Sequence, residues 1–321
     1  MRDRVGLGWR PELAAETLVH LAHVDVVEVI ADDWFGAPAQ RLRALRTLAS
    51  QVPVVLHGVG MGLASCTRVA DSRLEAMARV VDVVRPDFWS EHLAFVRAGG
   101  HEIGHLAAPP RLGDTLEGTA ANVDRARRVV GSGPLLENVA TLVEPPGDRS
   151  EGDWVAGVLQ ATGAGLLLDL HNLHANAANF RFDAVDFLDR IPAERVSAIH
   201  LAGGRWVPTS DGRPRLVDDH LHDVPAVVFA LLEEVARRAP QPLTVIVERD
   251  GRYPPFAVLV AELDAARRAL AAGRARRDAA GRDAAGRDAA GRDAAGRDAA
   301  GRDTASQDSA GHSAGDMAVA S

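Results

Sequence analysis

The stretch Gly163 to Phe180, GAGLLLDLHNLHANAANF, constrains the fold of this chain more than any other. It begins with a short apolar run, Ala164 to Leu168, which is typical of a strand buried on both faces of a parallel sheet. Because burying polar groups without partners is costly, the polar residues after the run predict a binding site at the end of this strand. Four such residues lie within six positions: Asp169, His171, Asn172 and His174.

Seven more short apolar runs alternate with amphipathic segments or long loops before residue 272. Together the runs predict strands over residues 5–9, 25–31, 52–56, 87–90, 134–136, 164–168, 196–199 and 243–247. Helices are predicted from near Pro11 and over residues 39–50, 72–84, 119–130, 154–162, 225–238 and 256–270. This alternation predicts an α/β fold, either a (β/α)8 barrel or a doubly wound open sheet.

The distribution of polar residues favours the barrel. An open sheet gathers its ligands at one switch point, whereas here nearly every strand from the second to the eighth ends in acids, histidines or amides. In a barrel all of these ends meet over one pocket. Gly58, Gly60 and Gly62 follow His57, but their spacing does not match the GxGxxG dinucleotide fingerprint. We therefore predict a TIM-type (β/α)8 barrel domain over residues 1–272.

Composition argues against several classes of function. The chain contains no lysine, which excludes a Schiff-base lysine, a pyridoxal anchor and a P-loop lysine. Its net charge of −8 argues against nucleic acid as the main partner. No apolar run reaches the roughly 18 residues of a membrane span, and the N-terminus lacks the apolar core of a secretory signal. The single cysteine, Cys66, suits a reducing cytoplasm.

Residues 273–321 form a tail of low complexity. The unit RDAAG occurs five times between Arg277 and Gly301, and its period matches neither a helix nor a strand. No large apolar side chain is present there to offset the entropy lost on ordering. We expect the tail to be disordered, with transient helix, and we exclude His312 from the site.

Polar side chains at the predicted strand ends match the ligand set of first-row divalent metals. Carboxylates and imidazoles without thiolates suit iron, zinc or manganese and disfavour a structural zinc or an iron–sulfur cluster. A single histidine at a strand end is more often a satisfied polar group than a ligand. Carboxylates gathered in one pocket, however, repel one another unless cations neutralise them. The strongest candidates are His57, His92, Glu137, Asp169, His200 and Glu248.

Further residues join this set on weaker grounds. Asp218 and His220 come from a loop, and their spacing could place both on one ion. Glu28 lies inside a strand, where we expect a neighbour to satisfy it. The number of ligands predicts two or three ions, with Glu137 as a carboxylate bridge. Groups that would orient ligands or act as additional ones are Glu91, Asn138, His171, Asn172, His174 and His222.

Eight segments, in order along the chain, resemble a known enzyme family. They are GLGWRPEL (6–13), HGVGMGL (57–63), SEHLAF (90–95), LLENVATL (135–142), GLLLDLHNLHANAANF (165–180), IHLAGG (199–204), DDHLHDVP (218–225) and VERDGRYPP (247–255). Jointly they are similar to the multinuclear non-haem iron-dependent oxidative enzymes, the family that includes the methanobactin-biosynthesis oxidase. The resemblance covers about residues 5–268. It departs from the family pattern at Asp32-Asp33, where an acid followed by asparagine is usual, and in the RDAAG tail.

The resemblance implies a TIM-type barrel that holds two or three irons, with a mixed-valent Fe(II)/Fe(III) pair as the active form. It implies O2 as co-substrate and modification of cysteine, or another residue, in a ribosomally made precursor peptide. A separate partner protein would recognise the leader peptide. Asp250 is a candidate for proton transfer. The ligands implied by motif are His57, His92, Glu137, Asp169, His200, Asp218, His220 and Glu248.

Two alternatives would use the same ligands. A sugar isomerase or a trinuclear-zinc endonuclease on the same barrel would work without O2, and the endonuclease would need a basic rim that the net charge does not favour. A metal-binding or precursor-escorting protein would keep the ligands but lack activity. Activity without O2 and reactivity toward peptides therefore separate these alternatives from the oxidase.

Overall fold

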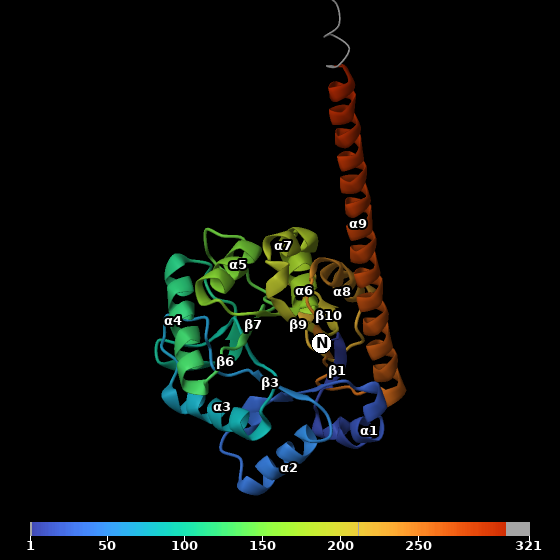
Figure 1. Cartoon of the computed structure of the whole chain (residues 1–321). Coiled ribbons are helices and arrows are strands. Elements are labelled where there is room, and N and C mark those ends of the chain that lie inside the picture. Colours follow the sequence, from blue (N-terminus) through green and yellow to red (C-terminus); the bar gives the residue numbers. More distant parts are fainter. Residues whose placement is uncertain (1, 211, 306–321) are drawn as a thin grey trace, which may run out of the picture. The chain divides into compact units, whose positions relative to one another are not determined.

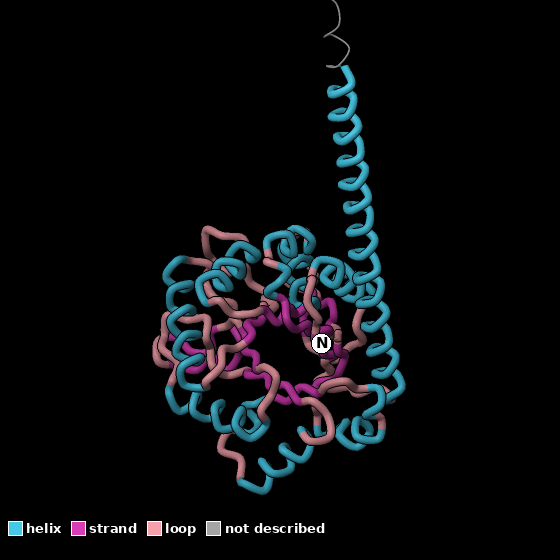
Figure 2. Tube along the Cα trace, viewed as in Figure 1, coloured by secondary structure: helices cyan, strands magenta, loops and turns pink. Residues whose placement is uncertain are grey.

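Eight parallel strands close into a barrel in the computed structural model, which describes residues 2–210 and 212–305, the last 23 of them by backbone alone. The strands are β1 (Arg4–Gly8), β2 (Val27–Ile30), β3 (Val54–Gly58), β4 (Trp89–His92), β7 (Leu135–Glu137), β8 (Leu166–Asp169), β9 (Val196–Leu201) and β12 (Thr244–Val247). Their order is β1-β12-β9-β8-β7-β4-β3-β2, and β1 pairs with β2 to complete the ring seen in Figure 2. The predicted TIM-type barrel is confirmed.

Helices surround the barrel (Figure 1). The α-helices are α1 (Ala14–Val19), α2 (Ala39–Ala49), α3 (Asp71–Val84), α4 (Gly113–Val130), α5 (Glu151–Thr162), α6 (Leu170–Phe180), α7 (Ala184–Arg190), α8 (Ala226–Arg238) and α9 (Phe256–Ala305). Four 3-10 helices are η1 (Pro11–Leu13), η2 (Leu21–His23), η3 (Ala31–Trp34) and η4 (Ala193–Arg195). Gly131 and Gly163 end α4 and α5 at φ values of 88° and 66°, which glycine adopts at the lowest cost.

The alternation of side chains along each strand directs the site residues into the barrel. Successive side chains on a strand point to opposite faces. Five apolar strand residues belong to the main core cluster, which also contains the buried faces of the helices: Leu56, Leu136, Leu168, Ile199 and Val247. The residue after each of them therefore points inward. These inward residues are His57, Glu137, Asp169, His200 and Glu248.

A much smaller apolar cluster is separate from the main core. It consists of Val26, Val55 and Ile246, with Phe88 packed against it. By the same alternation, Val55 and Ile246 point into the barrel. Gly6 pairs with Ile246, and a Cβ there would clash with the carbonyl oxygen of Val26, so glycine permits this close approach. Leu167 and Ala198, which are also fully buried, point inward by the same alternation. Apolar residues therefore fill the barrel below the level of the ionisable groups.

Several elements differ from those predicted. Helix α6 starts directly after β8, where the sequence predicted a polar strand end without a helix, because Asp169 accepts a hydrogen bond from the Asn172 backbone and caps the helix. Helix α7 was not predicted either. Two antiparallel hairpins were also missed, β5 (Phe95–Ala98) with β6 (His101–Ala107) and β10 (Gly204–Val207) with β11 (Arg215–Asp218). Helix α4 begins at Gly113 rather than residue 119.

The chain divides into two units, Met1–Arg274 and Ala275–Ser321. Helix α9 continues through the RDAAG repeat as far as Ala305, where the sequence predicted a disordered tail with transient helix. In the repeat each Asp precedes an Arg by four residues, a spacing that supports helix. Disorder of the tail in solution stays a prediction, and residues 306–321 lie outside the described part. None of the described helices is long and apolar enough to cross a membrane.

Candidate metal centre

His57, His92 and Glu137 form the first part of the centre, at the ends of neighbouring strands. The register pairs His92 with Glu137. Glu137 Oε2 lies 3.4 Å from His57 Nε2 and 3.3 Å from His92 Nε2. The other ring nitrogens face Ser90 Oγ, at 2.9 Å from His57, and the Gly58 carbonyl oxygen, at 3.3 Å from His92. These contacts orient both Nε2 atoms toward one carboxylate.

His200 lies at the middle of the centre and is completely buried. The register of β8 and β9 pairs it with Asp169. Its Nδ1 is 3.1 Å from Glu137 Oε1 and 3.0 Å from Glu248 Oε2. Its Nε2 is 3.0 Å from Glu28 Oε2, on the opposite side of the ring. Carboxylates therefore surround this imidazole on both nitrogens.

Asp218 and His220 bring a third part of the centre from the end of the β10–β11 hairpin. His220 adopts a positive φ of 53°, and its Nε2 lies 2.8 Å from Asp218 Oδ2. His220 Nδ1 lies 3.6 Å from Glu248 Oε2 and 3.2 Å from Asp250 Oδ2. The other Asp218 oxygen is 2.6 Å from His171 Nδ1. His220 therefore contacts the strand-end carboxylate Glu248, and Asp218 joins the centre through His220.

Four overlapping sets of three residues place potential ligand atoms within 4.8 Å of one another. The sets are His57, His92 and Glu137; Glu28, His200 and Glu248; Glu137, Asp169 and His200; and Asp169, His220 and Glu248. Seven of the eight ligands implied by the resemblance occur in these sets, and the eighth, Asp218, contacts His220. The structure brings all eight into one connected group that offers donors for more than one ion.

The centre gathers buried carboxylates whose charges act on each other. Burial, followed by the nearby carboxylates of Asp218 and Glu137, raises the pKa of Asp169 well above its usual range. Burial acts to lower the pKa of His200, but the surrounding carboxylates, with Glu248 the strongest, raise it well above its usual range. A group this crowded needs protons or bound cations to balance its charge.

Several buried polar atoms of the centre fit the role of metal donors. Within the described residues, Asp169 Oδ2, His171 Nε2 and Asn172 Oδ1 have no hydrogen-bond partner, and Glu137 Oε2 makes ion-pair contacts to His57 and His92 without a hydrogen bond. A buried polar atom left unpaired costs about 1–3 kcal/mol. Carboxylate oxygens and imidazole nitrogens are also the donors that first-row divalent ions bind. The residues present therefore fit a metal centre.

Two amides hold Asp169 in place. Asn138 Nδ2 donates to the Asp169 carbonyl oxygen at 2.9 Å, and Asn138 Oδ1 accepts from the Asp169 backbone N–H at 2.9 Å. Asn172 Nδ2 donates to the Asn138 carbonyl oxygen at 3.0 Å, while its backbone N–H donates to Asp169 Oδ1 at 2.6 Å. The Asn138 side chain thus holds the Asp169 backbone, and Asn172 bonds the Asp169 carboxylate through its own backbone N–H. That these asparagines orient a metal ligand stays a prediction.

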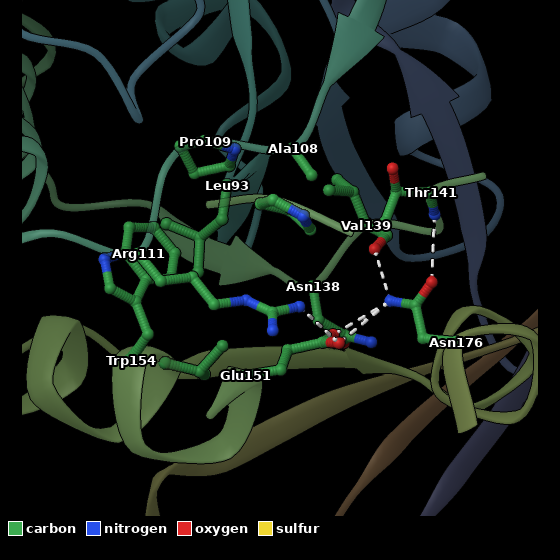
Figure 3. Close-up of a pocket in the computed structure, with 12 residues that line it drawn as sticks. Leu93, Ala108, Pro109, Arg111, Asn138, Val139, Thr141, Glu151, Trp154 and Asn176 are labelled. Carbon is green, nitrogen blue, oxygen red and sulfur yellow. Dashed lines mark hydrogen bonds and ion pairs between the residues drawn. The ribbon is translucent and has the colours of Figure 1, made fainter. Parts of the chain in front are cut away.

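A buried ion pair supports the loop that follows β7, as Figure 3 shows. Asn176 Nδ2 donates to the Val139 carbonyl oxygen at 2.9 Å, and Asn176 Oδ1 accepts from the Thr141 backbone at 2.9 Å. The same amide donates to both oxygens of Glu151, and Arg111 lies 3.1 Å from Glu151 Oε2. The network therefore fixes the chain directly after strand β7, which ends at the candidate ligand Glu137.

None of the six residues predicted as orienting groups or additional ligands belongs to the four sets found among the described residues. His174 is half-buried on α6. His222 Nδ1 pairs with Asp219 Oδ1 at 2.8 Å. Glu91 is fully buried, and its Oε1 accepts from the His92 backbone at 3.1 Å. Of the group expected to orient ligands, His171 contacts the centre directly through its bond to Asp218.

Two residues near the centre were not selected from the sequence. Glu28 faces His200, the neighbour that satisfies it, and it belongs to one ligand set. Its signal was available, because strand alternation places this acid on the inner face of an otherwise apolar run. Arg10 donates to Asp250 Oδ1 and lies 4.0 Å from Glu248 Oε1. Its position after β1 was the only sequence signal for it.

A family model described as RiPP precursor modification enzyme MbnB/TglH/ChrH matches residues 4–271. The chain belongs to this family. The abbreviation denotes ribosomally synthesised and post-translationally modified peptides. The resemblance inferred from the eight segments is thereby confirmed, and the match covers the whole barrel.

Relatives of this chain carry the name UPF0276 protein. One from Rhizorhabdus wittichii is 37% identical over 245 residues, which cover 76% of this chain and 86% of that protein. One from Caulobacter vibrioides is 35% identical over 274 residues, covering 85% of this chain and 96% of that protein. One from Streptomyces avermitilis is 36% identical, and the matched region spans only about half of it, 54%.

Solved structures with the same barrel include sugar epimerases. L-ribulose 3-epimerase matches with a TM-score of 0.56 and 14% identity, over 88% of this chain and 97% of that chain. A D-psicose 3-epimerase from Clostridium cellulolyticum H10 matches with a TM-score of 0.55 and 12% identity, over 85% of this chain and 99% of that chain. At this identity the similarity establishes the fold alone.

Proposed function

We propose that this enzyme uses O2 and a centre of two or three iron ions to oxidise cysteine, or another residue, of a ribosomally made precursor peptide. The observation that carries the proposal is the overlap of the four ligand sets, in which Glu137, Asp169, His200 and Glu248 each occur twice. Imidazole and carboxylate donors without thiolate suit redox-active iron. When bound, iron supplies the oxidative chemistry with O2 that protein side chains lack.

One carboxylate connects two parts of the centre. Glu137 presents Oε2 to His57 and His92 and Oε1 to His200, so this carboxylate is placed to bridge two ions. Asn138 holds Asp169 from behind. The residues that would hold the irons are His57, His92, Glu137, Asp169, His200, Asp218, His220 and Glu248.

Asp250 is the group we assign to proton transfer. Burial acts to raise the pKa of its carboxyl, but the bond to His220 and the guanidinium of Arg10 keep it below its usual range, so it is ionised near neutral pH. Its side chain is 43% exposed, which leaves it open to a substrate at the mouth of the barrel. Its Oδ2, next to His220 Nδ1, is the atom that would accept a proton.

Further parts of the proposal follow from the family. A separate protein that recognises the leader peptide would deliver the precursor, and a reducing cytoplasm would suit the single, exposed Cys66. Neither a nucleic acid nor a membrane is needed. The precursor peptide is expected in a short reading frame beside the gene.

The proposal is tested by purifying the protein without O2, measuring iron per chain, and following O2 consumption with a cysteine-containing peptide encoded beside the gene. We expect two or three irons per chain and peptide-dependent O2 uptake. Full occupancy by zinc, without any oxidation of the peptide, would refute it.

A sugar isomerase or epimerase is the rival that uses the same barrel and the same donors. It would convert its substrate without O2, so activity on a sugar in an anaerobic assay would favour it. A metal-bound protein inert toward both sugars and neighbouring peptides would instead favour an escorting role.

A further inference from the structure

A cavity of about 380 Å³ opens at the carboxyl ends of β1 and β2, and we call it the rim cavity. Trp9 and Arg10 follow β1, Ile30 ends β2, Trp34 ends η3, and Asp250 follows β12. These strand ends lie on the face of the barrel that carries the candidate ligands. The volume falls in the range of about 300–1,000 Å³ typical of pockets for small molecules and side chains.

The rim cavity adjoins the candidate metal centre. Asp250, in its wall, lies 3.2 Å from His220 Nδ1, and Arg10, also in its wall, lies 4.0 Å from Glu248 Oε1. His220 and Glu248 are candidate ligands. A group bound in the cavity therefore lies one side chain away from the centre. A substrate residue next to the reacting residue is expected at such a separation.

The charges that line the rim cavity cancel. Its lining contains two arginines, Arg10 and Arg41, and two aspartates, Asp33 and Asp250. Arg10 and Asp250 form an ion pair. A pocket that selects an anionic or cationic side chain needs an excess of the opposite charge, so this lining disfavours both classes of ligand.

The remaining walls are apolar and aromatic. They include Trp9 and Trp34, with Pro11 and Ile30 beside them. The guanidinium carbon of Arg41, on α2, lies 4.9 Å from the centre of the Trp34 ring, a cation–π contact that holds this indole in position. Flat apolar walls of this kind gain most from aromatic side chains, which pack against indoles.

We propose that the rim cavity binds a large apolar side chain, preferentially an aromatic one, from a position of the peptide close to the residue that is modified. The proposal rests on the proposed function only for its claim that the ligand is a peptide. Trp34 is then a residue that determines specificity, and Arg41 positions it.

The test measures binding of four synthetic peptides by isothermal titration calorimetry, without O2, to the full-length protein as purified with its metal. The peptides are acetylated and amidated cysteine dipeptides with phenylalanine, leucine, aspartate or glycine before the cysteine. We expect the phenylalanine peptide to bind about tenfold more tightly than the glycine peptide. Trp34→Ala should remove this preference, and Trp34→Phe should restore most of it.

Trp206→Ala is the matched control, because Trp206 is 55% exposed on β10 and does not line the rim cavity. It should keep the preference. Should Trp34→Ala fail to fold, the exposed Arg41→Ala should still reduce the preference about two- to fivefold. An unchanged preference in either variant, equal binding of all four peptides, or stronger binding of the aspartate peptide would overturn the proposal. Tighter binding of free monosaccharides, lost in Trp34→Ala, would overturn it in favour of a sugar.

The two proposals fail separately. The binding preference requires neither O2 nor turnover, so it can hold in a protein that never consumes O2. In the same way, peptide-dependent O2 uptake without any side-chain preference would refute the proposed role of the rim cavity. The proposed oxidase activity would still stand.

Discussion

Glu28→Gln tests whether a buried acid that lies behind His200 controls metal binding. His200 presents Nδ1 to Glu137 and Glu248, at 3.1 and 3.0 Å, and Nε2 to Glu28, at 3.0 Å. If a metal binds at Nδ1, Nε2 carries the proton and donates it to the Glu28 carboxylate. Such a bond fixes the tautomer and the ring orientation of a ligand histidine and raises its basicity.

The expected magnitude follows from the contact itself. Both side chains are at most 1% exposed, so the hydrogen bond to the carboxylate is hardly screened by water. A hydrogen bond to a charged group contributes about 1.5–3 kcal/mol. Loss of a carboxylate behind a ligand histidine typically lowers metal affinity about 10- to 100-fold, which corresponds to about 1.4–2.8 kcal/mol. The two ranges agree, and we expect Glu28→Gln to weaken the most affected iron site by one to two orders of magnitude.

The assay is anaerobic competition for Fe(II) with a coloured chelator, combined with a count of iron per saturated chain. Asp87→Asn is the control, because Asp87 is an exposed acid paired with Arg4. We expect the saturated iron count of Glu28→Gln to equal that of the unsubstituted protein. An unchanged affinity would refute the reasoning. Loss of one whole ion at saturation would instead show that Glu28 is itself a ligand.

Three further outcomes are expected. Burial raises the pKa of Glu151 to about 7 from an ordinary 4.5, so its contribution to stability is complete below pH 4.5 and is lost as the pH rises through 7. The unfolding free energy of the unsubstituted protein relative to Glu151→Gln should therefore fall by about 3 kcal/mol over this range in denaturant titrations at several pH values. Gly204→Ala would place a Cβ against the Val217 carbonyl and 2.5 Å from His171 Cε1, so iron per chain should fall while the control Gly113→Ala, in open space, retains it. Stripping metal with a chelator should lower the melting temperature in a calorimetric scan, more at pH 8 than at pH 5, because the crowded carboxylates then lose their counter-ions.

The barrel and most of the centre could be predicted because two regularities act together. Parallel strands place their carboxyl ends on one face, and the polar residue after each apolar run marks where that face begins. His57, Glu137 and Asp169 follow this rule directly. The register of strands β4 and β7 shows in addition that His92 pairs with Glu137, which the spacing of these residues in the sequence could not show.

Helix α6 could not be predicted by the same rules. Asp169 is both a strand-end candidate ligand and the cap of the helix that follows, so the polar cluster after β8 resembled a loop. Asparagines within the helix, such as Asn176 and Asn179, disfavour helix locally. They are retained there because they bond other parts of the fold: Asn176 bonds Thr141, in the loop after β7, and Asn179 bonds Leu216, on strand β11. Tertiary hydrogen bonds of this kind have no signal in a single sequence.

The β5–β6 hairpin, by contrast, does have a signal in the sequence. Gly99-Gly100 separates two short runs and is a recognised turn signal, so β5 and β6 could have been found. The role of Arg10 was beyond sequence reasoning, because its contacts to Asp250 and Glu248 join residues about 240 positions apart.

The separation of the two apolar clusters explains how the fold tolerates such a charged interior. In barrels of this type layers of apolar side chains fill the interior, and among the described residues Val26, Val55 and Ile246, with Phe88 against them, form an apolar cluster apart from the main core. The main core lies between strands and helices and contains no ligand. Substituting a candidate ligand such as Glu137 therefore leaves the apolar core that holds the barrel together intact. Loss of metal should precede loss of fold in such variants, which lets metal content and chemistry be measured on folded protein.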